Sequence, residues 1–198
     1  MITKFEDLDL SKRYTYADYL TWKFDEMVEI IRGKVFRMAP APGMSHQSRS
    51  GDLYGIIWSY LRDKPCKAFS APFDVRLPLP PEKQSDDKID TVVQPDISVI
   101  CDLAKLDERG CNGAPDWIIE ILSMATSKKD LTDKFDLYQH AGVREYWIVH
   151  PIEATVIPYR LNEKNEYQPL RPNPFVMGEK VPVGIFEGFS VDLDEVFA

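Results

Sequence analysis

The sequence predicts a single α/β domain, residues 1–198, with a mixed central sheet flanked by helices and a β-rich C-terminal end. Apolar runs rich in Ile, Val and Trp cover 95–101 and 115–122, and such runs are typical of buried strands. Residues 45–61 and 127–141 instead carry apolar side chains at helical spacing. The 198 residues are 44% hydrophobic and 28% charged, which are ordinary values for one globular domain.

The N-terminal part predicts a short helix followed by a hairpin. Residues 14–22 show an amphipathic pattern, for which Thr15 is the expected N-cap. Residues 27–38 contain two apolar, β-branched runs that meet at Arg32-Gly33. This pattern predicts a β-hairpin whose turn is formed by these two residues.

The next segment predicts a loop, a long helix and two strands. Residues 39–43 contain two prolines and a glycine, so they must form a loop. Ser45 is the candidate cap of the helix expected over 45–61. Residues 67–70 and 73–77 alternate apolar and polar side chains, as half-buried strands do.

Loops, a helix end and shorter strands complete the expected order. The polar, Pro-interrupted stretch 78–88 predicts a loop, and 103–112 predicts a second loop with room for one helical turn. The helix over 127–141 is expected to stop at Gly142. The remaining expected strands are 146–149, 155–160, 167–170 and a final pair that flanks 186–189.

Two carboxylates stand at the ends of the buried runs: Asp96 opens one and Glu120 closes the other. An ionised carboxylate beside a buried strand is costly unless it is paired. A divalent cation is one such partner, because Mg²⁺ binds one or two carboxylates together with substrate phosphates. Neighbouring strands lie about 4.8 Å apart, so both carboxylates can reach one ion, with the Ile121 backbone carbonyl as a third oxygen ligand.

A lysine on the following helix could complete this set. Lys134 shares a helical stripe with Asp130 and Leu137, next to an apolar stripe that includes Phe135 and Tyr138. If the apolar stripe packs on the sheet, Lys134 lies at its border. A lysine there can act as a point charge beside metal and phosphate.

The linked order of these motifs resembles the bacterial family of putative restriction endonucleases with the PD-(D/E)xK nuclease fold. The resemblance extends from Tyr14 to Leu193. The standard motif of this fold keeps a Lys two residues after the glutamate, where this chain has Leu122, and in this resemblance the Lys role falls to Lys134. The matching segments are Pro95-Asp96, Glu120 to Ser123, Asp130 to Lys134 and Val143 to Trp147.

The resemblance implies a restriction-endonuclease-like core that hydrolyses DNA with Mg²⁺ or Mn²⁺. Asp96 and Glu120 would bind the cation, and Lys134 would orient or activate the attacking water and balance charge. Glu29, in the predicted hairpin, is a candidate third carboxylate. His46, near the start of the long helix, could contact phosphate or tune the metal site. A homodimer could present two such sites to a duplex.

Each residue of the central set also has a structural interpretation. Asp96 could accept hydrogen bonds from nearby backbone N–H groups of a turn. Glu120 could serve the loop that follows its strand. Lys134 could pair with Asp130 one turn earlier on the same helix.

The outer residues have structural alternatives as well. Glu29 could pair across the hairpin with Lys34 or Arg37, and His46 could cap its helix. Asp74 also matches the family, and a structural role in its strand is the alternative.

A second class of function stays open, a non-catalytic binding or regulatory module that kept the fold. Leu122 favours it, because a lost Lys is how such sites decay. Lys134 opposes it, because a decayed site has no reason to keep a Lys on that helix face. No target-recognition region is recognisable in the 198 residues.

The charge distribution is uneven. A formal net charge of −8 argues against non-specific coating of nucleic acid, since phosphate attraction supplies most of such binding. Residues 30–70, however, carry seven Lys and Arg residues against two Asp residues. This basic third could be a nucleic-acid face, or it could be ordinary solvated surface.

The sequence indicates a cytosolic protein. No apolar run approaches the roughly 20 residues that span a bilayer, and acidic residues stand where a signal peptide would need basic ones. Cys66, Cys101 and Cys111 form no CxxC pair, so we expect three free thiols and no zinc site.

Overall fold

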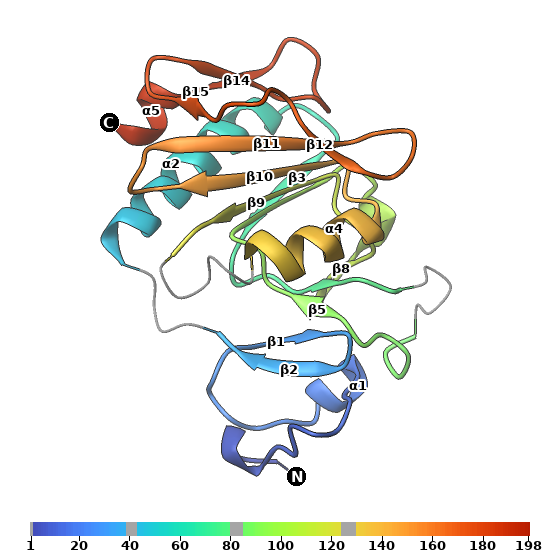
Figure 1. The fold of residues 1–198 in the computed structure, drawn as a ribbon. Helices are drawn as coiled ribbons and strands as arrows, with labels where there is room; N and C mark the ends of the chain where they lie inside the picture. Colours follow the sequence, from blue (N-terminus) through green and yellow to red (C-terminus); the bar gives the residue numbers. More distant parts are fainter. Residues whose placement is uncertain (1, 39–42, 80–84, 124–129) are drawn as a thin grey trace.

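The computed structural model describes residues 2–38, 43–79, 85–123 and 130–198. It confirms the α/β class: two larger mixed sheets lie one above the other in Figure 1, and helices pack against the upper one. Among the described residues, no helix is long and apolar enough to cross a membrane.

The upper sheet is built around strand β9 (Trp117–Ile121). It pairs antiparallel with β6 (Ile97–Ile100) and parallel with β10 (Glu145–His150), which confirms that the two apolar runs are sheet neighbours. The strand order is β12-β11-β10-β9-β6-β3. The other members are β3 (Lys67–Ser70), β11 (Thr155–Leu161), β12 (Tyr167–Pro169) and β13 (Phe175–Val176), which pairs with β11.

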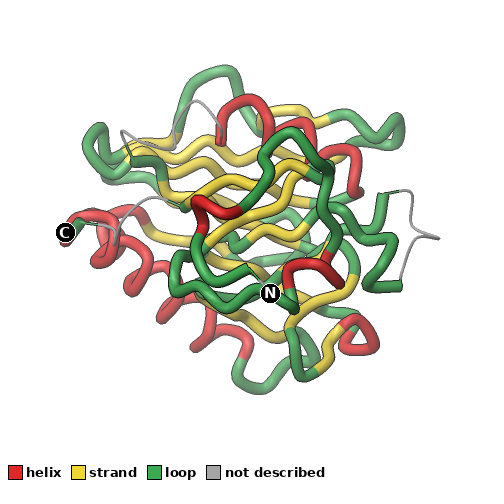
Figure 2. Tube along the Cα trace, turned by 90° about the horizontal axis from the view of Figure 1, so that it is seen from below, coloured by secondary structure: helices red, strands yellow, loops and turns green. Residues whose placement is uncertain are grey.

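Helices cover both faces of this sheet because the side chains of β9 alternate. Trp117 and Ile119 belong to the buried cluster that includes Leu53 and Ile57 of α2 (Met44–Leu61). Ile118 belongs to the opposite cluster, with Leu137 and Tyr138 of α4 (Phe135–Ala141). Figure 2 shows the long helix α2 running along one side of the strands.

The two predicted helices, 45–61 and 127–141, are present as α2 and α4, but their ends do not all match the prediction. The N-cap of α2 is Gly43, so the prediction of Ser45 as cap is wrong; the helix starts one residue before it. Helix α4 stops at Gly142, whose φ of 85° is the left-handed conformation expected of a C-terminal glycine. The expected start near 127 lies outside the described residues, and α4 follows a π-helical turn, η3 (Asp130–Lys134).

The lower sheet contains the predicted hairpin. Strands β1 (Val28–Ile31) and β2 (Lys34–Arg37) are joined by Arg32 and Gly33, whose φ values of 50° and 80° confirm the turn. The order is β2-β1-β5-β4-β8-β7. The short helix α1 (Tyr16–Tyr19) begins with the expected cap, Thr15, which forms a capping box with Asp18.

The prediction of a loop with one helical turn over 103–112 is right for the turn and wrong for the rest. After a 3₁₀ turn, η2 (Leu103–Lys105), β7 (Leu106–Asp107) and β8 (Gly110–Asn112) form a small hairpin. Its β8 strand pairs with β4, a long-range contact that local sequence patterns do not show. The bounds of the other two strands of the lower sheet are Val75–Arg76 for β4 and Val92–Val93 for β5. The remaining elements are η1 (Phe5–Asp7), β14 (Lys180–Pro182), β15 (Ser190–Asp192) and α5 (Leu193–Phe197).

The expectation of three free thiols is also wrong. Cys66 and Cys101 form a disulfide with Cα atoms 4.0 Å apart, and Cys111 is a buried free thiol. The reason is strand pairing. Lys67 of β3 lies opposite Ile100 of β6, so the cysteines that flank this pair meet although they are 35 residues apart in sequence.

The core beneath α2 supports a stability prediction. Ile57 is 0% exposed and packs with the β6 and β9 side chains. We expect Ile57→Ala to lower the free energy of unfolding by about 2–5 kcal/mol through lost burial and a residual cavity, measured by urea denaturation. Ser59→Ala, on the exposed side of the same helix, should change it by less than about 0.5 kcal/mol. Equal effects of both substitutions would contradict the packing described.

Candidate active site

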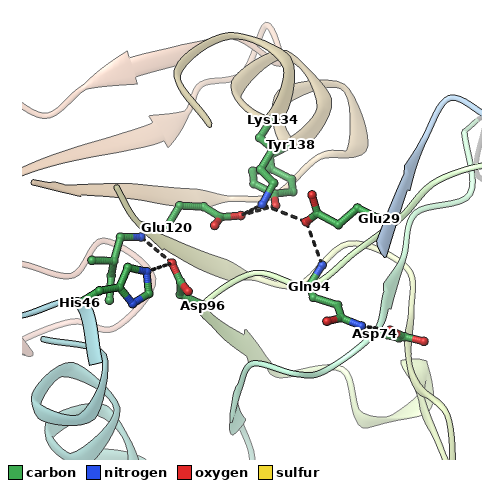
Figure 3. Close-up of polar contacts among 9 residues, drawn as sticks. Glu29, His46, Asp74, Gln94, Asp96, Glu120, Lys134 and Tyr138 are labelled. Carbon is green, nitrogen blue, oxygen red and sulfur yellow. Dashed lines mark hydrogen bonds and ion pairs between the residues drawn. The ribbon is translucent and has the colours of Figure 1, made fainter. Parts of the chain in front are cut away.

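Asp96 and Glu120 lie opposite each other across the β6–β9 pair. Ile97 is opposite Ile119 in the register, and continuing the register by one residue places Asp96 opposite Glu120. Opposed residues of antiparallel strands project from the same face. Ile119 faces α2, and its two neighbours in β9, Ile118 and Glu120, face the opposite side, which α4 covers. Figure 3 shows the side chains at this place.

Asp96 stands at the more open side of the site. One of its oxygens, Oδ2, accepts a 2.7 Å hydrogen bond from the Ile121 backbone N–H, and His46 Nε2 lies 3.3 Å from the same oxygen. The side chains of Asp96 and His46 are 19% and 14% exposed. The alternative of a carboxylate bonded to backbone N–H is therefore present, but the donor belongs to the neighbouring strand. His46 faces Asp96, and the helix cap is Gly43.

Glu120 is almost fully enclosed. It is 3% exposed, and its Oε1 atom accepts hydrogen bonds from Lys134 Nζ at 2.8 Å and from Tyr138 Oη at 2.6 Å. Both donors come from one helical segment, η3 followed by α4. Most of the loop named in the alternative role, residues 124–129, lies outside the described residues.

Lys134 points into the site. It is 5% exposed, and its Nζ atom lies 3.0 Å from Glu29 Oε1 as well as 2.8 Å from Glu120 Oε1. The side chain of Asp130, its alternative partner, lies outside the described residues. The structure thus brings Lys134 together with carboxylates from both sheets (Figure 3).

Glu29 joins the site from the lower sheet. It is 2% exposed, and besides Lys134 it accepts a 3.2 Å hydrogen bond from the Gln94 backbone N–H. The cross-hairpin alternative is wrong in this structure. Glu29 lies opposite Phe36, and Arg37 instead forms ion pairs with Glu6 at 2.7 Å and Glu26 at 3.3 Å.

Two participants in the site, Tyr138 and Gln94, are absent from the predicted set. Tyr138 packs in the apolar cluster, as its stripe predicts, and its position four residues after Lys134 is the signal that the two can share a helix face. Gln94 bonds Glu29 through its backbone and donates from Nε2 to Asp74 Oδ1 at 2.8 Å. Asp74 also lies 3.4 Å from the Tyr16 hydroxyl, and its burial raises the pKa of its carboxyl group. Asp74 therefore helps to fix Gln94, whose backbone N–H in turn binds Glu29 of the site.

The donor chemistry of the site fits a hard divalent cation. The carboxylates of Glu29 and Glu120 lie within 3.0 Å of the Lys134 ammonium, and Asp96 lies opposite Glu120 in the strand register. The formal charges of these three carboxylates and one ammonium leave the site at −2. Oxygen donors of this kind suit Mg²⁺ and Mn²⁺. Within the described ranges, no group of three or more His, Cys, Asp or Glu side chains is arranged to hold an ion. The fit therefore rests on two carboxylates, which is the number Mg²⁺ typically takes.

Part of the basic third is engaged within the chain. Arg49 donates to the backbone carbonyls of Val196 and Ala198, and Arg62 lies over the Trp58 ring. These arginines stabilise local structure. The contacts favour the interpretation of this region as ordinary surface.

Comparisons with known proteins agree with the fold. The sequence matches the Uma2 family, described as "Putative restriction endonuclease", over residues 16–194. The structure resembles the crystal structure of a putative nuclease belonging to DUF820 from Anabaena variabilis ATCC 29413, with a TM-score of 0.66 and 25% sequence identity. The match covers 93% of this chain and 97% of the other. A search among curated proteins finds no significant match.

The buried ammonium supports a second prediction. Lys134→Met leaves the carboxylates of Glu29 and Glu120 enclosed without that cation, so we expect a loss of about 3–5 kcal/mol in the free energy of unfolding. Adding Glu29→Gln should restore part of this loss, because one buried charge is removed. Urea denaturation of both variants tests this.

The matched control is Lys164→Met, an exposed lysine whose loss should change stability by less than about 0.5 kcal/mol. A Lys134→Met variant as stable as the wild type would show that the ammonium does not balance these carboxylates.

Proposed function

The chain belongs to the Uma2 family of putative restriction endonucleases, and on this premise we propose that it is a Mg²⁺-dependent (or Mn²⁺-dependent) endonuclease that hydrolyses phosphodiester bonds of DNA. One observation carries the proposal. The Lys134 ammonium is enclosed within 3.0 Å of Glu29 and Glu120, on the sheet face and at the strand end where Asp96 lies opposite Glu120. Enclosed clusters of paired charges are concentrated at functional sites, which supports this proposal.

Asp96, Glu120 and the Ile121 backbone carbonyl are the residues that would hold the cation. When bound, the ion supplies a Lewis acid that polarises the phosphoryl group and activates water. The chain's own contribution is to fix its ligands. Asp96 is tied to the Ile121 backbone at 2.7 Å, and Glu120 is held by two donors from one helix.

Lys134 supplies the positive charge that the transition state of phosphoryl transfer requires. In this proposal Lys134 replaces the lysine of the standard motif, because the position two residues after Glu120 is occupied by Leu122. Leu122 is 6% exposed and belongs to the apolar cluster that contains Leu137 and Tyr138. Lys134 instead extends from the helical segment and donates a hydrogen bond to the Glu120 carboxylate.

Glu29 and His46 take supporting roles in the proposal. Glu29 holds the Lys134 ammonium from the side of the lower sheet, as a second carboxylate within 3.0 Å of this cation. His46 stands beside Asp96 at the open side of the site, where an approaching phosphate would meet it.

DNA is a polyanion and the chain has a formal net charge of −8, so extended contact with the phosphate backbone would be repulsive. We therefore expect the protein to contact DNA only locally, around the site. One copy of the chain offers one site, so cutting both strands of a duplex would suit a homodimer. By analogy with the bacterial family that the sequence resembles, we propose that it acts in the cytoplasm, where the DNA of such cells lies. Sedimentation of the purified protein tests the dimer.

Leu122 favours the second candidate, a nuclease-fold module that binds without cleaving. Both candidates expect cation binding and DNA binding. They differ in whether supercoiled plasmid is converted to nicked and linear forms when Mg²⁺ or Mn²⁺ is added.

We expect the wild type to nick plasmid DNA with Mg²⁺ or Mn²⁺, and Asp96→Asn or Glu120→Gln to lower the rate at least about 100-fold. Each isosteric change removes a charged ligand and with it the Lewis acid. Plasmid conversion followed on agarose gels measures the rate, and circular dichroism shows that the variants remain folded.

Asp133→Ala is the matched control, since it removes an exposed carboxylate directly before Lys134 and should keep full activity. If the wild type and Glu120→Gln show the same residual cleavage, the cleavage comes from a contaminant and the binding module is the better description.

A further inference from the structure

Tyr138 is the second donor to Glu120, and the proposed chemistry gives it no contact with the cation or the substrate. Its hydroxyl lies 2.6 Å from Glu120 Oε1, the shortest hydrogen bond made with this carboxylate among the contacts described above. The residue is 0% exposed, and its ring packs edge-on against Tyr146 with centroids 5.2 Å apart. The hydroxyl is therefore held in one place by the surrounding core.

The two donors to Glu120 meet at a single oxygen. Lys134 and Tyr138 are one helical turn apart, and both donate to Oε1. Two donors on one oxygen fix the rotation of the carboxylate group. In the view of Figure 3, the other oxygen of Glu120 lies on the side of Asp96.

The two donors are not equivalent. The Lys134 ammonium is shared with Glu29 at 3.0 Å, and it is the group that the proposed reaction turns towards phosphate. The Tyr138 hydroxyl carries no formal charge, and its ring is enclosed by the core beside Tyr146, so it is placed to hold Glu120 and not to engage the substrate.

We propose that Tyr138 is a positioning residue: its hydroxyl holds Glu120 Oε1 so that the second oxygen stays directed at the cation site when Lys134 engages the substrate. This rests on the proposed function, since it assigns Glu120 as a metal ligand. Partners that orient a ligating side chain typically contribute 10–100-fold in metal affinity. The hydroxyl should therefore act mainly on cation binding.

The test is Tyr138→Phe, which keeps the ring and removes only the hydroxyl. We expect the dissociation constant for Mn²⁺, measured by isothermal titration calorimetry without DNA, to rise about 10–100-fold. The Mg²⁺ concentration that gives half-maximal plasmid nicking should rise in parallel, while the rate at saturating Mg²⁺ should change little.

Tyr167→Phe is the matched control. Tyr167 is a buried tyrosine of the same aromatic cluster whose hydroxyl donates to the Val143 carbonyl at 2.9 Å. Both substitutions remove one buried hydrogen bond, so their melting temperatures should fall to a similar extent. Tyr167→Phe should leave the Mn²⁺ dissociation constant unchanged.

The outcomes separate the two proposals. If Tyr138→Phe binds Mn²⁺ as tightly as the wild type, or if Tyr167→Phe weakens binding equally, Tyr138 is only a packing residue and this inference fails alone. If the wild type binds no divalent cation, the proposed function fails and the inference fails with it. Weaker Mn²⁺ binding that is confined to Tyr138→Phe supports both.

Discussion

The site depends on the register of a single antiparallel strand pair. Ile97 opposite Ile119 sets Asp96 opposite Glu120, and it also decides which side chains of β9 face each helix layer. A slip of one residue would exchange the two faces, turning Glu120 into the core beneath α2 and Ile119 towards α4. The large buried groups that oppose such a slip, Trp117 among them, therefore hold the carboxylates in position although they never touch the site.

A second constraint is the burial of Lys134. An ammonium that is 5% exposed needs compensating charge, and the carboxylates of Glu29 and Glu120, which lie within 3.0 Å of it, come from both sheets. Glu29 lies on the hairpin of the lower sheet and Glu120 on the central strand of the upper one. Lys134 thus connects the sheets at the point where the chemistry is proposed. Folding of the N-terminal hairpin and assembly of the site are linked for this reason.

Sequence patterns identified the residues whose signals are local. Asp96, Glu120 and Lys134 stand at the borders of periodic apolar segments, and the hairpin turn at Arg32-Gly33 is encoded by two residues. Sequence patterns could not show the features that depend on pairing between distant segments. The Cys66–Cys101 disulfide follows from the β3–β6 register, and β8 becomes a strand because β4 lies beside it. Gln94 binds Glu29 of the site through its backbone N–H, and the type of side chain at a position does not predict such a backbone contact.

Burial of an acid alone does not mark the site, as Glu145 shows. It is 0% exposed, and burial raises the pKa of its carboxyl group. Its hydrogen bonds come from Trp147 Nε1 at 2.7 Å and from the backbone N–H groups of Gly184 at 2.6 Å and Ile185 at 3.1 Å. These donors are fixed parts of the fold, so Glu145 anchors the C-terminal segment to β10. Glu120 is held instead by a lysine and a tyrosine side chain, and Lys134 carries a charge that a phosphate can attract. Arg160 Nε also lies near Glu145, but at 3.8 Å, farther than the 2.8 Å between Lys134 and Glu120. The difference in donors, more than burial or pKa, supports the proposed role of Glu120 as a metal ligand.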